Sequence, residues 1–165
     1  MITWAARSPE ERGLLTPSFC ALLLWHAARG YFSNSGASLA FKMSFLILPV
    51  VLHRETRESL PMAITTSLAV WVVRNPLASS RIANRAQLLV PFTKEALTFG
   101  GIHGLLIISG NTVAPSLDWR RKVTATLKTS SEEVRTCAKR AEFLGRWFAK
   151  SGSPDTVMAL IGVRL

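Results

Sequence analysis

Cysteine is scarce in this sequence, in which Cys20 and Cys137 lie far apart along the chain. No Cys-x-x-Cys pair and no cluster of cysteine with histidine occurs, so the usual ligand pattern of a zinc site is missing. Both cysteines lie in apolar segments with helical spacing, where a free thiol packs as a small hydrophobic group. This usage favours a reduced, cytoplasmic protein that binds no metal.

Long hydrophobic runs are also lacking. The longest one spans residues 44–52, contains Pro49 and has charged residues on both sides. Because a membrane-spanning helix needs about 20 apolar residues, we expect a core element here and no association with a membrane. Glu10, Glu11 and Arg12 precede the first apolar run, which argues against a secretory leader.

Catalytic motifs are missing as well. The glycines of residues 100–104 have neither the lysine nor the spacing of a phosphate-binding loop, and no Gly-x-Ser-x-Gly elbow occurs. We therefore expect a chain that is not an enzyme, with no catalytic residue and no cofactor. The alternative is an enzyme in which His53, beside Glu55, does acid–base chemistry. His53 could instead cap a helix or form an ion pair, which needs no catalysis.

Positive charge is what the sequence has in excess. Its 165 residues include 20 Lys and Arg against 10 Asp and Glu, a net charge of +10. Such charge attracts nucleic acid, anionic lipids or an acidic partner, although it can also serve solubility alone. No Asn or Gln pairs with Arg in a base-reading pattern, so any contact with double-stranded DNA would be to its phosphates. The candidate DNA-backbone residues are Arg81, Arg85, Arg120, Arg121, Lys122, Arg135, Lys139 and Arg146.

A chain of this length suits one domain, residues 1–165, with enough core to need no disulfide. Thr16 and Pro17 open a first helix that should be apolar almost all round and end at Gly30. Further helices are predicted at 40–52, 65–75, 79–90, 91–99, 130–150 and 156–161. We expect an irregular N-terminal arm at 1–15, a helical core with a hairpin at 16–115, a loop at 116–130 and C-terminal helices at 131–165.

The β-hairpin is predicted at 104–108 and 112–114, where short apolar runs flank Ser109-Gly110-Asn111. A helix followed at once by a hairpin is how a winged helix-turn-helix ends. The sequence therefore predicts a mainly α protein, a compact helical domain with a small β-hairpin and a winged helix-turn-helix-like form. The alternative is a hairpin that only covers a helical core.

Segment 53–61 carries charges that alternate in sign at helical spacings. It is either a solvated polar turn with local ion pairs or a segment that contacts a partner. Trp and Arg are favoured at interface centres, and Trp4 is a further candidate of that kind. The candidate partner-interface residues are His53, Arg54, Glu55, Arg57, Glu58, Trp119 and Trp147.

Six blocks of sequence carry a resemblance when taken in order. They are TPSFCALL at 16–23, LPVVLHRETRESLP at 48–61, RA at 85–86, PFTKEALTFG at 91–100, LGRWFA at 144–149 and LIGVR at 160–164. In this order they resemble the middle component of bacterial three-component ABC ATPase systems. The first block usually begins Asn-Pro where this chain has Thr16-Pro17, and threonine caps a helix almost as well.

The resemblance implies a role in conflict with phages or plasmids, as in Lamassu-like defence. Such systems pair an ABC ATPase of the SMC, or chromosome-maintenance, type with an effector that is often a nuclease. The middle component would bridge the two or help to clamp DNA, and it would not hydrolyse ATP itself. The family supplies no catalytic residues to carry over. The competing hypothesis is a stand-alone winged-helix DNA-binding regulator.

Overall fold

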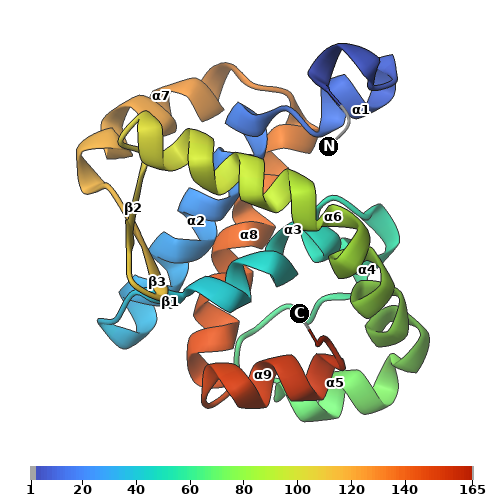
Figure 1. Cartoon of the computed structure of the whole chain (residues 1–165). Coiled ribbons are helices and arrows are strands. Elements are labelled where there is room, and N and C mark those ends of the chain that lie inside the picture. The colour runs from blue at the N-terminus through green and yellow to red at the C-terminus, as the bar shows by residue number, and fades with distance from the viewer. Residues whose placement is uncertain (1–2, 165) are drawn as a thin grey trace.

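The computed structural model describes residues 3–164, and most of them are helical (Figure 1). The helices are η1 (Trp4–Ala6), α1 (Pro9–Leu14), α2 (Pro17–Ser35), η2 (Phe41–Met43), α3 (Ser44–Val51), α4 (Arg54–Ser59), α5 (Leu68–Arg74), α6 (Pro76–Ile102), η3 (Leu117–Trp119), α7 (Arg120–Thr129), α8 (Glu132–Lys150) and α9 (Pro154–Ile161). The strands are β1 (Leu39–Ala40), β2 (Leu106–Ser109) and β3 (Thr112–Pro115). The prediction of a mainly α protein is confirmed.

Helices α2 and α8 cross in the centre of the molecule and approach each other closely. A Cβ atom on Gly145 would lie 1.9 Å from the carbonyl oxygen of Ala27, and one on Gly30 would lie 2.1 Å from that of Glu142. The two glycines therefore allow backbone-to-backbone contact that no other residue type permits. The predicted end of the first helix at Gly30 is wrong, because Gly30 serves this crossing and the helix ends at Gly36, which has a φ of 71°.

Burial of α2 and α8 follows their sequences. Helix α2 is buried on most sides, as its nearly continuous apolar sequence predicts. The amphipathic helix predicted at 130–150 is confirmed as α8, and the hydroxyl of Ser131 caps it by accepting from the Val134 N–H. Its apolar face, with Cys137, Leu144 and Phe148 buried, packs on α2.

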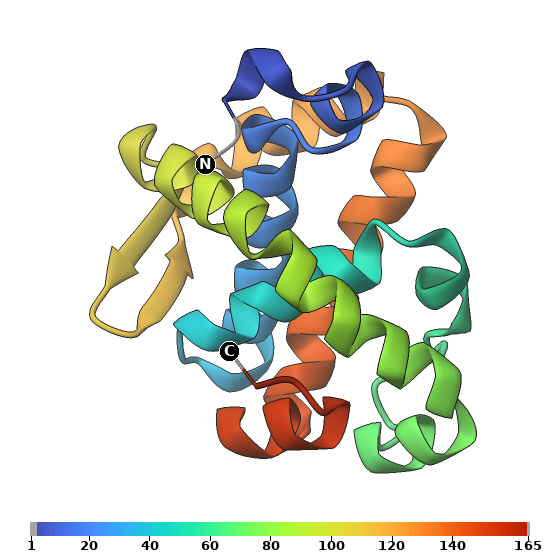
Figure 2. The same ribbon diagram turned by 45° about the vertical axis from the view of Figure 1, so that its right-hand side comes forward.

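Helix α6 is a single helix of 27 residues, so the predicted division into 79–90 and a new helix from Pro91 is wrong. Pro91 lies on the exposed side, where its ring meets solvent and the helix loses one backbone hydrogen bond without breaking. Burial of Ala86, Thr93 and Ala96 on the opposite side holds the helix together across the proline. Figure 2 shows α6 crossing in front of α2 and α3.

The hairpin of β2 and β3 is confirmed, with Leu106 opposite Pro115 and Ser109 opposite Thr112. Strand β1 pairs with β3 as well, which gives a three-stranded antiparallel sheet in the order β1-β3-β2. The helix favoured for 40–52 is confirmed from Ser44 onward, after β1 and η2. Helix α6 ends immediately before this hairpin.

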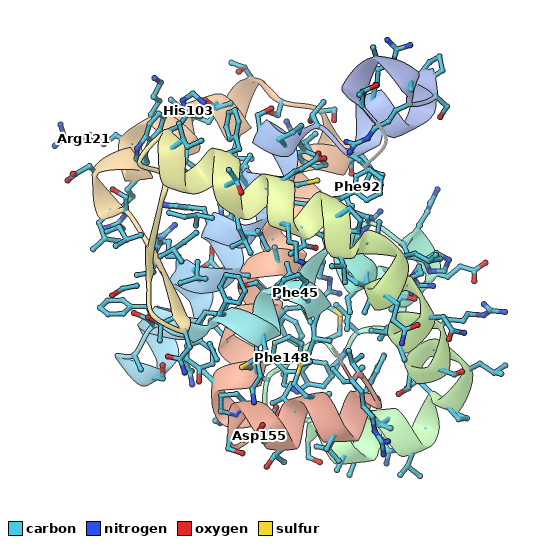
Figure 3. All side chains as sticks on the ribbon, in the orientation of Figure 1. Phe45, Phe92, His103, Arg121, Phe148 and Asp155 are labelled. Atoms are coloured by element: carbon cyan, nitrogen blue, oxygen red, sulfur yellow. The ribbon has the colours of Figure 1, made fainter. Side chains whose placement is uncertain are left out.

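Two segments expected to be irregular contain helices. Residues 116–130 form η3 and α7, so the prediction of a loop is wrong. The sequence of α7 shows little apolar periodicity, because Val123 is the one buried residue of this fully described helix and most of the others are polar or charged. The arm at 1–15 holds η1 and α1 within its described part. The buried Arg7 ties this arm to α6, since its Nη1 atom lies 2.8 Å from Oε2 of Glu95 and its guanidinium lies 4.5 Å from the ring centre of Phe92, labelled in Figure 3.

Candidate functional site

Segment 53–59 forms a cap and a short helix rather than a turn. His53 caps α4, because its Nδ1 atom accepts from the Thr56 N–H at 3.3 Å and lies 2.9 Å from the Thr56 hydroxyl. Desolvation lowers the pKa of His53, and the charge of Arg85 lowers it further. A lowered pKa favours the neutral ring, which is the form that can accept this hydrogen bond. The geometry of His53 is therefore that of a helix cap.

Arg57, one of the candidate interface residues, is only 3% exposed and lies inside the protein. Its Nη1 atom donates to the carbonyl oxygen of Val51 at 2.7 Å and lies 3.3 Å from Sγ of Cys137. Its Nη2 atom donates to Oε1 of Glu133 at 2.5 Å. Arg57 thus joins the end of α3 to the start of α8 from a position between them.

Arg85, a candidate for DNA contact, is also engaged within the molecule. Its Nε atom donates to the carbonyl oxygen of Pro49 at 3.0 Å, and its Nη2 atom donates to the Thr56 hydroxyl at 2.8 Å. Burial lowers the pKa of Arg85, and the neighbouring charge of Arg81 adds to that effect. Arg85 holds α6 against α3 and α4.

The exposed charges around α4 form two surface ion pairs. Nε of Arg54 lies 2.8 Å from Oε1 of Glu58, and Nη1 of Arg81 lies 3.2 Å from Oε2 of Glu55. Hydrogen bonding to Arg54 lowers the pKa of Glu58. The structure therefore brings together four of the candidate residues, although Arg81 had been assigned to DNA and the others to a protein partner.

Apolar side chains are exposed beside these pairs. Leu77, at the start of α6, is 71% exposed and lines a hollow of about 340 Å³ together with Glu55 and Arg81. Val73, at the end of α5, is 79% exposed. Neither residue was predicted as a site residue from the sequence, although the position of Leu77 directly after Asn75-Pro76 marks the exposed start of a helix. The exposed residues Arg54, Glu55, Glu58, Val73, Leu77 and Arg81 are called the α4 surface below.

Helix α7 presents a second surface of different character. Arg120, Arg121 and Lys128 line a shallow hollow together with Thr124 and Ala125, and all five residues are exposed. The sequence of α7 contains no carboxylate. Figure 3 shows Arg121 extending away from the body of the protein. The cations Arg120, Arg121 and Lys128 are called the α7 surface.

Helix α8 carries the remaining candidate cations. Arg135 is half-buried and donates to the carbonyl oxygen of Ser130, whereas Lys139 and Arg146 are exposed. Glu142 lies among them, and the main cause that lowers the pKa of its carboxyl is the neighbouring His26, whose Nδ1 atom lies 3.8 Å from Oε2 of Glu142. A negative charge therefore lies among the candidate cations of α8.

The candidate tryptophans differ in burial. Trp147 is buried, donates from Nε1 to the carbonyl oxygen of Thr66 at 2.6 Å and packs edge-on against Trp71. Trp119 is half-buried, and the ammonium of Lys122 lies 4.7 Å from the centre of its ring. The side chain of Trp4 lies outside the described residues. Trp147 is thus core, and Trp119 keeps an exposed edge.

Residues 3–164 contain no group of three or more His, Cys, Asp or Glu side chains placed to hold a metal ion. Within the same range, no helix has the length and apolar character needed to cross a membrane.

Comparison with known families supplies the class of this small helical subunit. The model of the family described as "ABC-three component (ABC-3C) system Middle Component 3" matches residues 4–165. The chain is thus a component of a multi-component ABC system. It belongs to the Middle Component 3 family, which confirms the resemblance seen in the sequence. No curated protein and no solved structure matches it.

Proposed function

We propose that this chain is a non-catalytic adaptor that bridges an SMC-type ABC ATPase and an effector subunit in a prokaryotic anti-phage or anti-plasmid defence complex. The observation that carries this proposal is that α4 and α7, which carry two unlike surfaces, lie near opposite ends of α6 (Figure 1). The α4 surface lies at the N-terminal end of α6, and α7 lies at its C-terminal end. A helix of this length spans about 40 Å, enough to keep two partners apart.

The α4 surface suits a protein partner. Its ion pairs, Arg54 with Glu58 and Arg81 with Glu55, leave little net charge, and the exposed Val73 and Leu77 supply apolar area beside them. Apolar area rimmed by polar groups is typical of a protein interaction site. His53 and Arg57 contribute by holding α4 in place rather than by contact.

The α7 surface suits a polyanion such as the backbone of double-stranded DNA. Helix α7 carries four exposed cations, Lys122 among them, and no carboxylate. This matches the requirement of phosphate contact, which needs accessible positive charge and no special spacing. Lys139 and Arg146 line a separate hollow on α8 together with Glu142, so the α7 cations carry the proposed contact. Because base-reading side chains are not paired here, binding would be independent of sequence.

The second candidate function is a stand-alone winged-helix DNA-binding regulator. The observation that favours it is the position of α6 directly before the β2–β3 hairpin. The cations of α6 weigh against it, because Arg85 is bonded to Pro49 and Thr56, and Arg81 is paired with Glu55. A recognition helix needs such side chains free for DNA, so the adaptor is the better-supported function.

Tagged co-purification with the products of the neighbouring genes tests the adaptor role. The wild-type chain is expected to recover both an ABC ATPase and an effector. Leu77→Asp should lose one partner, and Leu88→Asp is the matched control, since Leu88 is 72% exposed on the same helix but outside the α4 surface. Recovery of the folded chain alone, together with a footprint at a defined promoter, would favour the regulator instead.

A further inference from the structure

A groove beside α7 has an apolar floor. It has a volume of about 430 Å³ and is formed by α2, α6, α7 and the start of α8. Val123 and Leu105 are buried at its base, and Phe19, Leu22 and Phe99 are half-buried around them. These side chains leave an accessible apolar trough, which we call the α7 groove.

The rim of the α7 groove carries one exposed cation, Lys122. Lys122 lies over the ring of Trp119 on one side, and His103 stacks on Phe99 at 4.2 Å between ring centres on the other. Figure 3 shows His103 at the end of α6 beside α7. Among the described residues that line the groove there is no aspartate or glutamate.

We infer that the α7 groove binds an acidic amphipathic helix of a partner protein. A trough between helices accepts apolar side chains spaced at i, i+3, i+4 and i+7, which is the helix-in-groove mode of recognition. Lys122 would pair with an Asp or Glu on the flank of that helix and speed its association. The identity of the partner, an ATPase or effector subunit, rests on the proposed function. The acidic and amphipathic character of the bound helix rests on the groove alone.

Two other occupants fit less well. A second copy of this chain carries a net charge of +10, so like charges would oppose its approach to Lys122. Nucleic acid would leave the apolar floor of Phe19, Leu22 and Val123 without a complementary surface, since its phosphates would reach only the rim.

The chemistry is tested with two synthetic helical peptides of about 18 residues, or five turns. Both carry Leu and Phe at the i, i+3, i+4, i+7 positions, and one has Glu where the other has Lys. Fluorescence anisotropy should show the full-length protein binding the Glu peptide and not the Lys peptide. Equal binding, or no binding of the Glu peptide, overturns the inference.

Charge reversal places the contact. Lys122→Glu should weaken Glu-peptide binding by roughly tenfold, because it replaces an attraction by a like-charge contact. The matched control is Lys150→Glu, the same change at the far end of α8, which should leave binding unchanged. Both lysines are exposed, so both variants are expected to fold. An equal loss of Glu-peptide binding in the two variants would contradict a peptide groove. So would competition in which duplex DNA displaces the peptide from the wild-type protein by binding at Lys122.

The partner is tested in the assembled complex. A photocrosslinking phenylalanine analogue at Val123 should attach to a segment of the ATPase or the effector that is amphipathic and rich in Asp and Glu. If the complex assembles and the attached segment is basic, or none is attached, the groove assignment fails while the adaptor role stands. If the Glu peptide binds but neither subunit is recovered, the adaptor role fails while the groove chemistry stands.

Discussion

Arg57 and Glu133 are 76 residues apart in sequence, yet Nη2 of Arg57 donates to Oε1 of Glu133 at 2.5 Å across the junction of α3, α4 and α8. The guanidinium is almost fully buried, whereas the carboxylate reaches the solvent edge. The exposed carboxylate of Glu133 therefore stabilises the buried positive charge of Arg57. Its removal tests whether segment 53–61 stabilises the fold as well as carrying exposed charge.

Arg57→Met should lower the free energy of unfolding by about 2 kcal/mol, because the carbonyl oxygen of Val51 then loses a donor inside the protein. Urea unfolding measures the change. Arg54→Met is the control, since Arg54 forms only the exposed pair with Glu58 and should show no measurable loss. Equal losses in the two variants would mean that Arg57 acts merely through surface charge.

Gly145→Ala should destabilise the protein by about 1–3 kcal/mol or more, because the added methyl would overlap the carbonyl oxygen of Ala27 and push α2 and α8 apart. The control is Gly101→Ala in α6, where the nearest atom to an added Cβ is Cδ1 of Ile108 at 3.7 Å. That change should be neutral or stabilising by up to ~1 kcal/mol. Thermal unfolding of both variants measures the two changes. A Gly145→Ala protein as stable as the wild type would contradict the close contact between α2 and α8.

Stability should fall at alkaline pH through Cys20. Burial raises the pKa of this thiol from 9.0 to about 12, and the charge of Glu95 contributes. Because the folded state then holds the proton more tightly than the unfolded state, the stabilisation is complete below about pH 9 and is lost as the pH rises from 9 to 12. Urea unfolding at pH 8 and pH 10.5 should show this loss, and Cys20→Ala should reduce it. An identical pH dependence in both proteins would exclude Cys20 as its source.

Binding of duplex DNA, measured by anisotropy between about 50 and 200 mM salt, should weaken steeply with salt. Arg120→Ala with Arg121→Ala should reduce the slope of log K against log salt by about 2, since each phosphate contact contributes about 0.9. Arg54→Ala removes a cation from the α4 surface and should leave the slope unchanged. An unchanged slope in the double variant would remove the α7 surface from the proposed DNA contact.

Local sequence signals determined several elements correctly. Ser131 opens α8, and the apolar period that follows it is long enough to define the buried face. Ser109-Gly110-Asn111 between two short apolar runs defines the β2–β3 turn, where Gly110 has a φ of 57°. The six sequence blocks also sufficed to identify the family, because they span most of the chain. These features depend on neighbours in sequence, so the sequence contains their cause.

The burial of Arg57 and the continuity of α6 could not be predicted from the sequence, because both depend on residues far away in the chain. The side chain of Arg57 is buried because Val51 and Glu133 meet it from two other helices, and nothing in an alternating charge pattern separates it from the exposed Arg54. Helix α6 continues through Pro91 because packing on one face outweighs one lost hydrogen bond.

The α7 groove illustrates the same division. The sequence alone determined the family, the helical content and the excess of positive charge. The tertiary structure decided which cations stay on the surface and brought Phe19, Phe99 and Val123 into one trough, since their helices meet only when the core forms. Burial and contact between residues far apart in the chain depend on the packing of whole helices, and that packing is set by the complete chain rather than by any single segment.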